Sequence, residues 1–236
     1  MSLKEQLKQM KEATLERMPQ SIIQVFENSI DEIKKNGLKE KALKIGDKVP
    51  DVPLTNIDEG TVLLSELQKT DYLILNFYRG GWCPYCNMEL REYERLREDF
   101  NQLNTDIIGI SAERIERTSQ TSHKNALSFP ILTDVNAQLM KEIGIVFQLD
   151  KASKQEYINF GIHLDEIHAN SSFELPVPAV YVINKDREIV YVHIEEDYMT
   201  RLEPSILLEF IRNKSVKAES CTSSNELGLS RSKVKS

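Results

Sequence analysis

The sequence predicts an α/β fold in which a mixed β-sheet is covered by helices, and three patterns indicate this class. Two short apolar runs of strand length, residues 73–78 and 106–110, are separated by a helix-like stretch over residues 84–103. A β–α–β unit of this kind predicts parallel pairing. Two later apolar runs, residues 179–183 and 188–193, flank a polar four-residue loop, which is typical of an antiparallel hairpin. Parallel and antiparallel pairs together make the sheet mixed.

Size and charge exclude several classes of protein. The chain has 236 residues and a net charge of −7, and the stretch 45–211 alone carries −13 because both ends of the chain are basic. An acidic body argues against nucleic-acid binding. No run of eighteen or more apolar residues is present, and the charged N-terminal segment lacks the apolar core of a signal peptide. We therefore expect no membrane partner and a cytoplasmic location, where disulfides tend to be transient and catalytic.

The N-terminal segment, residues 1–44, reads as a helical extension. Residues 2–36 predict two helices broken near Pro19, and Gly37 is a plausible C-terminal cap. In the second helix the apolar side chains recur at helical spacing: Ile22, Ile23, Phe26, Ile30 and Ile33. Two interpretations remain open: this helix packs on its own domain, or it binds a partner or a second copy in a homodimer.

The rest of the chain reads as one domain and a tail. The domain covers residues 45–211 and includes a further helix over residues 114–127 and a last helix that starts near Pro204. From about Asn213 the chain is rich in Ser and Lys and poor in apolar side chains. This composition predicts a disordered tail over residues 212–236.

The strongest chemical signal is Trp82-Cys83-Pro84-Tyr85-Cys86, which follows a predicted strand and opens a predicted helix. The first turn of a helix offers free backbone N–H groups and a partial positive charge, both of which favour a thiolate over a thiol. Pro84 fits the first helical position, where no N–H group is needed. The CxxC spacing places both sulfurs on one face of the first turn, near enough to bridge. The motif therefore indicates a redox-active cysteine pair.

Other interpretations of these cysteines are weaker. A structural zinc site needs four ligands. The third cysteine of the chain, Cys221, lies in the predicted tail, and no pair of histidines stands at ligand spacing. Two inert apolar cysteines rarely explain a CxxC motif sited between a strand and a helix. We expect neither a metal nor another cofactor, and no structural role for Cys221.

Four segments of residues 45–211 follow the pattern of one protein family: Phe77-Tyr78-Arg79-Gly80-Gly81-Trp82-Cys83-Pro84-Tyr85-Cys86-Asn87-Met88-Glu89-Leu90, Gly46-Asp47-Lys48-Val49-Pro50-Asp51-Val52, Phe129-Pro130-Ile131-Leu132-Thr133-Asp134 and Asp197-Tyr198-Met199-Thr200-Arg201-Leu202-Glu203-Pro204. With these segments the chain resembles the alkyl hydroperoxide reductase and thiol-specific antioxidant family, the peroxiredoxins, and in particular its CxxC-bearing subgroup. The resemblance implies a thioredoxin-like fold and a thiol peroxidase that reduces hydroperoxides. It also implies a thioredoxin- or glutaredoxin-type reductant.

The resemblance assigns the two sulfurs one way, and general CxxC chemistry assigns them the other way. Aligned with the peroxiredoxin motif T-P-x-C, Cys86 takes the peroxidatic position and Cys83 replaces the threonine, which makes Cys83 the resolving cysteine. In thioredoxin-like CxxC motifs the first cysteine is normally the exposed, acidic one. Of the two assignments, we slightly favour the one from the alignment, with Cys86 as the peroxidatic cysteine. Trp82, Pro84 and Tyr85 are expected to support the pair.

Two departures from the peroxiredoxin pattern concern Pro178 and Arg79. Peroxiredoxins usually have an arginine just before the late strand, where this chain has Pro178. Thioredoxin-like folds place a cis proline there, opposite the CxxC motif, so we expect a cis peptide bond at Pro178. Arg79 stands where peroxiredoxins have proline and is a candidate for the missing cation, with a surface charge as the equal alternative.

Two other functions remain open beside the peroxidase. Pro178 in place of an arginine favours a general thiol–disulfide oxidoreductase that acts on protein substrates. A non-enzymatic redox sensor, whose helical extension binds a partner, is the second alternative.

Overall fold

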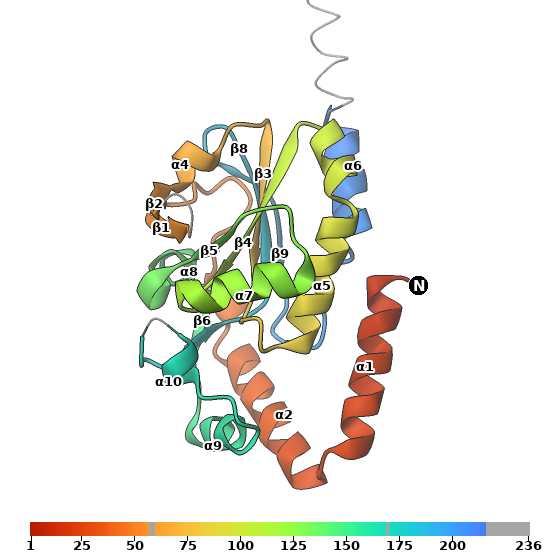
Figure 1. Ribbon diagram of the computed structural model, residues 1–236, viewed down its shortest axis with the longest axis vertical. Helices are drawn as coiled ribbons and strands as arrows, with labels where there is room; N and C mark the ends of the chain where they lie inside the picture. Colours follow the sequence, from red (N-terminus) through yellow and green to blue (C-terminus); the bar gives the residue numbers. More distant parts are fainter. Residues whose placement is uncertain (57–59, 169, 216–236) are drawn as a thin grey trace, which may run out of the picture.

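A mixed β-sheet runs through the centre of the computed structural model, which describes residues 1–56, 60–168 and 170–215 (Figure 1). Over these residues seven strands pair in the order β2-β1-β5-β4-β3-β8-β9. Three neighbouring strands are parallel: β3 (Tyr72–Phe77), β4 (Thr105–Ser111) and β5 (Ile131–Thr133). The flanking strands are antiparallel: β8 (Ala179–Asn184) and β9 (Ile189–Ile194) beside β3, and β1 (Pro53–Asn56) and β2 (Gly60–Leu63) beside β5. The predicted α/β class with a mixed sheet is confirmed.

Helices cover both faces of the sheet because its central strands are apolar on both sides. In β3 the side chains of Leu73, Leu75 and Phe77 join one core, and that of Ile74 joins the other. The first face is covered by three short helices: α3 (Leu38–Lys41), α4 (Leu64–Leu67) and α8 (Gln138–Ile143). The second face is covered by α5 (Pro84–Arg95), α6 (Arg97–Gln102) and the helix over residues 204–215. Helix α7 (Ile115–Asn125) contacts α5 and β5.

The N-terminal extension forms the two predicted helices, α1 (Leu3–Arg17) and α2 (Gln20–Lys35), and they make a V below the sheet in Figure 1. Helix α1 buries Leu3 and Leu7 in the same core as α5. Its first backbone N–H groups, from Leu3 and Lys4, donate to the carboxylate of Glu203 at 3.3 and 3.0 Å. Helix α2 buries Phe26, Ile30 and Ile33 against its own chain, so packing on its own domain is seen in the structure. Binding of a partner or of a second copy stays a prediction.

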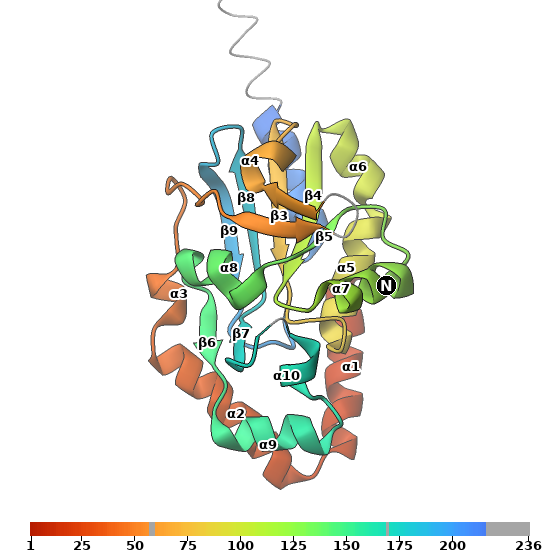
Figure 2. The same ribbon diagram turned by 60° about the vertical axis from the view of Figure 1, so that its left-hand side comes forward.

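The segment between β5 and β8 had no predicted elements, yet it is mostly regular. It consists of η1 (Val135–Ala137), α8, β6 (Val146–Gln148), α9 (Lys151–Asn159), α10 (Leu164–Ile167) and β7 (Glu174–Pro176). Strands β6 and β7 pair as a separate two-stranded sheet. This insertion carries α9 to the side of α2, where the rings of Phe26 and Tyr157 meet at 5.6 Å (Figure 2).

Two element boundaries differ from the prediction. The helix expected over residues 84–103 is divided at Leu96, whose backbone (φ −99°, ψ 6°) leaves the helical region. Residues 212–215, at the start of the predicted tail, continue the last helix. The remainder of the predicted tail, residues 216–236 with Cys221, lies outside the described residues. Among the described residues, no helix combines the length and the apolar character needed to cross a bilayer.

Candidate active site

The CxxC motif lies where β3 ends and α5 begins. Cys83 is the residue that precedes the first turn of α5, and Pro84 occupies the first helical position, as predicted. Both cysteines are free thiols and buried, with exposed fractions of 1% for Cys83 and 0% for Cys86. The neighbouring side chain of Pro84 is exposed. The redox pair therefore sits just below the surface at the positive end of a helix.

Arg79 is part of this site and not a surface charge. It is 3% exposed, and its guanidinium group lies over the rings of Tyr198 and Trp82, at 4.2 and 4.9 Å from their centroids. The same group donates a hydrogen bond to the hydroxyl of Tyr157 on α9. The surface interpretation of Arg79 is therefore wrong. Aromatic rings lie against this arginine, and its charge acts on the cysteines through a buried environment of low dielectric constant.

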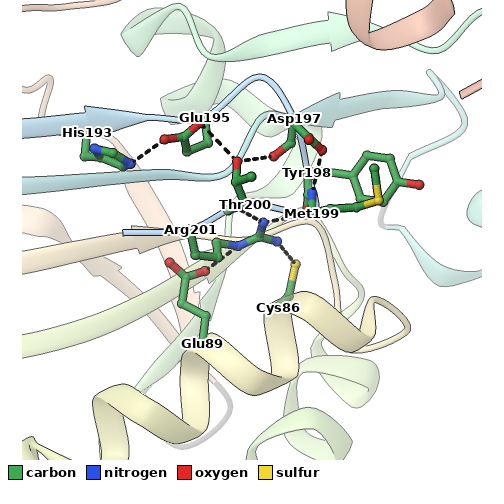
Figure 3. A network of polar contacts seen from close by, with 9 residues as sticks. All are labelled: Cys86, Glu89, His193, Glu195, Asp197, Tyr198, Met199, Thr200 and Arg201. Atoms are coloured by element: carbon green, nitrogen blue, oxygen red, sulfur yellow. Dashed lines mark hydrogen bonds and ion pairs between the residues drawn. The ribbon is translucent and has the colours of Figure 1, made fainter. Parts of the chain in front are cut away.

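A second arginine, Arg201, contacts the cysteine pair directly (Figure 3). Its Nη2 atom lies 3.0 Å from the sulfur of Cys86, and its Nε atom lies 2.8 Å from Oε2 of Glu89. The side chains of Arg201 and Glu89 are 1% and 3% exposed. Nη1 donates to the backbone carbonyl oxygens of Tyr198 and Thr200, which fixes the guanidinium in place.

Sequence reasoning did not assign a role to Arg201. It belongs to the family-like segment 197–204, but nothing in that segment shows that the chain turns back after β9 towards the start of α5. A signal was available, since the resemblance implies an arginine close to the peroxidatic cysteine and the expected position holds Pro178. Arg201 places a cation against Cys86 from a different place in the chain.

The prediction of a cis peptide bond at Pro178 is wrong. The described residues contain no cis peptide bond. Pro178 lies in an extended run that is hydrogen-bonded on both sides: Val177 N donates to Ile145 O, and Pro178 O accepts from Glu195 N, both at 2.9 Å. Because β7 leads straight into β8 here, the chain stays extended. Pro178 still reaches the site, since it lines a cavity of about 20 Å³ together with Arg79 and Tyr198.

The aromatic residues of the motif form the walls around the pair. Trp82 packs edge-on against Tyr157 at 5.4 Å, and Tyr85 packs edge-on against Tyr198 at 6.0 Å. The ring of Tyr198 thus contacts both the ring of Tyr85 and the guanidinium group of Arg79. These contacts connect the CxxC motif to α9 and to the segment that carries Arg201.

The two sulfurs differ in their electrostatics. Burial opposes ionisation of Cys83, but the adjacent Cys86 thiol and the charges of Arg79 and Arg201 outweigh it and lower the pKa of Cys83 to about 5. Burial and the neighbouring Cys83 raise the pKa of Cys86 well above its ordinary value, although Arg201 and Arg79 oppose this. Because a charge on one sulfur opposes a charge on the other, the pair holds one thiolate more readily than two, and the charge of Arg79 and the start of α5 favour its place on Cys83.

A buried carboxyl group accompanies the pair. Burial raises the pKa of Glu89 to about 7, in spite of the opposing charge of Arg201. Arg201 is thus shared between a carboxyl group that titrates near neutrality and the sulfur of Cys86. The site as a whole can hold a thiolate, keep a second thiol protonated beside it and bring the two sulfurs into a disulfide.

Comparisons with known proteins agree with this geometry. The sequence profile described as the AhpC/TSA family matches residues 45–192. Peroxiredoxin Bcp of Bacillus subtilis is 32% identical over 116 residues, which cover 49% of this chain and 73% of that protein. Peroxiredoxin Bcp of Escherichia coli is 24% identical over 170 residues, which cover 72% of this chain and 96% of that protein.

The fold is shared with solved structures as well. The crystal structure of peroxidoxin BcpB from Mycobacterium tuberculosis superimposes with a TM-score of 0.59 at 20% identity, over 72% of this chain and 97% of that chain. The predicted thioredoxin-like, peroxiredoxin-type architecture is confirmed. With its profile match over more than half of the sequence, the chain belongs to the AhpC/TSA family.

Proposed function

We propose that this protein is a thiol peroxidase in which Cys83 attacks the hydroperoxide and Cys86 resolves the product. The observation that carries the proposal is the buried charge of Arg79 at the redox motif, because this charge lowers the pKa of Cys83 and only a thiolate attacks peroxide. This order reverses the one that the family alignment implies. The start of α5 supports it, because Cys83 stands ahead of the first turn.

The cycle has three steps. The Cys83 thiolate attacks the outer oxygen of the hydroperoxide, the O–O bond breaks, and one proton is taken up to give Cys83 sulfenic acid and an alcohol or water. The Cys86 thiol then attacks the sulfenic sulfur, and water leaves as the Cys83–Cys86 disulfide forms. A dithiol donor reduces the disulfide by two thiol–disulfide exchanges and is itself oxidised.

The two arginines support different steps. The charge of Arg79 favours the Cys83 thiolate before the attack, and its N–H groups are suited to holding an oxygen of the peroxide. Arg201 lies against Cys86, so it stabilises the thiolate that Cys86 must become in the resolving step. Oxidation of Cys83 removes its negative charge, and both arginines then favour ionisation of Cys86.

The reductant is a thioredoxin- or glutaredoxin-type protein in this proposal. The exposed Pro84 and the partly exposed Trp82 mark the surface closest to the disulfide and offer such a donor its approach. The cycle requires a reducing compartment such as the cytoplasm, where these donors are kept reduced.

Peroxide turnover tests the function. The full-length protein is mixed with hydrogen peroxide or an organic hydroperoxide, a thioredoxin, its reductase and NADPH, and NADPH consumption is followed. We expect many turnovers in the wild type and none in Cys83→Ser or Cys86→Ser. Reduction of insulin disulfides without peroxide turnover would instead favour a thiol–disulfide oxidoreductase. Consumption of a single equivalent of peroxide would favour a sensor.

A further inference from the structure

The backbone of Gly81, two residues before Cys83, is hydrogen-bonded to buried side chains through both its N–H group and its carbonyl group. The Gly81 N–H donates to Oε2 of Glu113 at 2.9 Å, and the Gly81 carbonyl accepts from Nδ2 of Asn87 at 2.8 Å. Glu113 is 2% exposed and Asn87 is 4% exposed. Neither side chain has a role in the reaction proposed above. Both are hydrogen-bonded to the turn that precedes Cys83 and α5.

Further polar side chains support this arrangement from α5 and α7. Asn125 Nδ2 donates to Asn87 Oδ1 at 2.9 Å, and Arg91 Nη1 donates to Asn125 Oδ1 at 2.8 Å. Thr121 of α7 packs so closely on the turn that a Cβ atom at position 81 would lie 1.9 Å from its Oγ1. Glycine at position 81 is therefore what allows α7 to bring its polar side chains to the redox turn.

Glu113 also faces the preceding residue of the turn. Gly80 has φ +148°, and a Cβ atom there would lie 2.9 Å from Glu113 Oε1 and 2.3 Å from Trp82 Nε1. The Gly80 carbonyl accepts from the N–H of Cys83 at 3.0 Å. One carboxyl group thus lies against the whole Gly80–Trp82 turn, and the turn is hydrogen-bonded to the backbone of Cys83.

The surroundings of Glu113 make its charge variable. Burial raises the pKa of Glu113 to about 7, and the hydrogen bond from the Gly81 N–H opposes this rise. Ionisation of Cys86 would raise the pKa of Glu113 further. The other titratable or charged groups that face Glu113 are Tyr78 at the end of β3, Arg117 on α7 and His168, which pairs with Glu113 as a backbone bridge. A carboxylate accepts a hydrogen bond more strongly than a carboxylic acid does.

We propose that Glu113 is a positioning residue of the redox pair, which holds the Gly81 peptide through its carboxyl group and strengthens this hold when it ionises. The proposal rests on the proposed reactivity of Cys83, because the turn that Glu113 fixes leads directly to that residue. Glu113 acts on Cys83 through the backbone of the turn and does not contact the peroxide.

The amide proton of Gly81 reports on this directly. In ¹⁵N-labelled, reduced, full-length protein, we expect the Gly81 amide proton to shift between pH 5.5 and 8.5 with a midpoint of about 7 as Glu113 ionises. In Glu113→Gln this titration disappears, although the amide oxygen still accepts from Gly81. Glu116→Gln, at an exposed position in the first turn of α7, is the matched control and keeps the titration. A Gly81 proton that does not titrate, or one that still titrates in Glu113→Gln, overturns the proposal.

The consequence for Cys83 is measured by alkylation with iodoacetamide, with the modified residue located by mass spectrometry. Glu113→Gln keeps the hydrogen bond, so we expect its alkylation rate to stay within about threefold of the wild type. Glu113→Ala loses the acceptor, so we expect its alkylation rate to fall by about tenfold or more. Equal rates in all three proteins overturn the positioning role. Neither measurement uses peroxide, so a protein that passes both but fails to turn over peroxide would refute the peroxidase and leave this inference standing.

Discussion

Arg201 lies 3.0 Å from the sulfur of Cys86, although 115 positions of sequence separate the two residues. The contact exists because the chain turns back after β9 and places the segment 197–203 over the start of α5 (Figure 3). Arg79 approaches the pair from the other end of the motif, directly after β3. The two buried guanidinium groups explain how a pair of cysteines with almost no exposed surface holds a negative charge.

Replacing Arg201 should expose the cost of an unpaired Glu89. In Arg201→Met, Glu89 is left buried without its partner, so we expect a loss of about 3–5 kcal/mol in the free energy of unfolding. Arg201→Met combined with Glu89→Gln should recover a large part of this loss. Lys185→Met, which breaks an exposed ion pair with Asp71, is the control and should change stability little. Urea unfolding of the reduced proteins measures all four, and a double variant no more stable than the single one would contradict the account.

Replacing Arg79 should act on the acidity of Cys83. In Arg79→Met we expect the pKa of Cys83 to rise by about one unit or more, because one of the two charges that favour the thiolate is lost. Arg79→Lys keeps the charge but not the planar group that stacks on Tyr198 and Trp82. The pKa of Cys83 in Arg79→Lys should therefore lie between those in the wild type and in Arg79→Met. The pH dependence of alkylation at Cys83 gives the value, with the exposed Arg114→Met as the control. An unchanged profile in Arg79→Met would mean that Arg79 serves packing alone.

The low pKa of Cys83 should also make stability depend on pH in the reduced protein. The ordinary pKa of a cysteine is 9.0 and that of Cys83 in the fold is about 5, so the unfolded chain binds more protons between these values. Stability contributed by the thiolate is therefore fully present above pH 9 and is lost as pH falls to 5. Relative to Cys83→Ser, the wild type should gain at most about 1.4 kcal/mol for each pH unit in this window. Parallel stability curves for the two proteins would show that the thiolate is not favoured by the fold.

Removal of the C-terminal residues should leave the reaction nearly unchanged. We expect a chain that ends at residue 215, without Cys221, to consume peroxide at close to the rate of the full chain. The physical reason is that the charges and sulfurs invoked here all lie between Arg79 and Arg201. A large loss of turnover would indicate that Cys221 acts as a resolving thiol.

Much of the fold could be predicted from the sequence because its signals are local. A period or a breaking residue in the sequence itself marks each of these elements: the apolar runs of β3 and β4, the helices on either side of Pro19, and the polar loop between β8 and β9. The short elements between β5 and β8 could not be predicted, since strands of three residues and helices of four carry too few positions for a period. Helix α9 packs against α2, a contact between segments far apart in the chain that no local pattern shows.

In the candidate site, too, the residues with a local signal could be predicted and those that depend on distant contacts could not. The CxxC motif and its place at the start of a helix followed from spacing, and Arg79 was singled out by its position next to the motif. Arg201, Glu89 and Glu113 were not, because their importance depends on contacts between segments far apart in the chain. Pro178 was expected to be cis from resemblance alone, and the hydrogen bonds of Val177 and Pro178 to segments distant in sequence keep it extended.

Trapping of the sulfenic acid tests the assignment of the two sulfurs most directly. Reduced Cys83→Ser and Cys86→Ser are each treated with one equivalent of hydrogen peroxide in the presence of dimedone, and the adduct is located by mass spectrometry. The account predicts an adduct on Cys83 in Cys86→Ser and almost none in Cys83→Ser, because the charge of Arg79 and the start of α5 favour the thiolate on Cys83. An adduct on Cys86 in Cys83→Ser, with none in Cys86→Ser, would contradict it and make Cys86 the peroxidatic cysteine, as the family alignment implies.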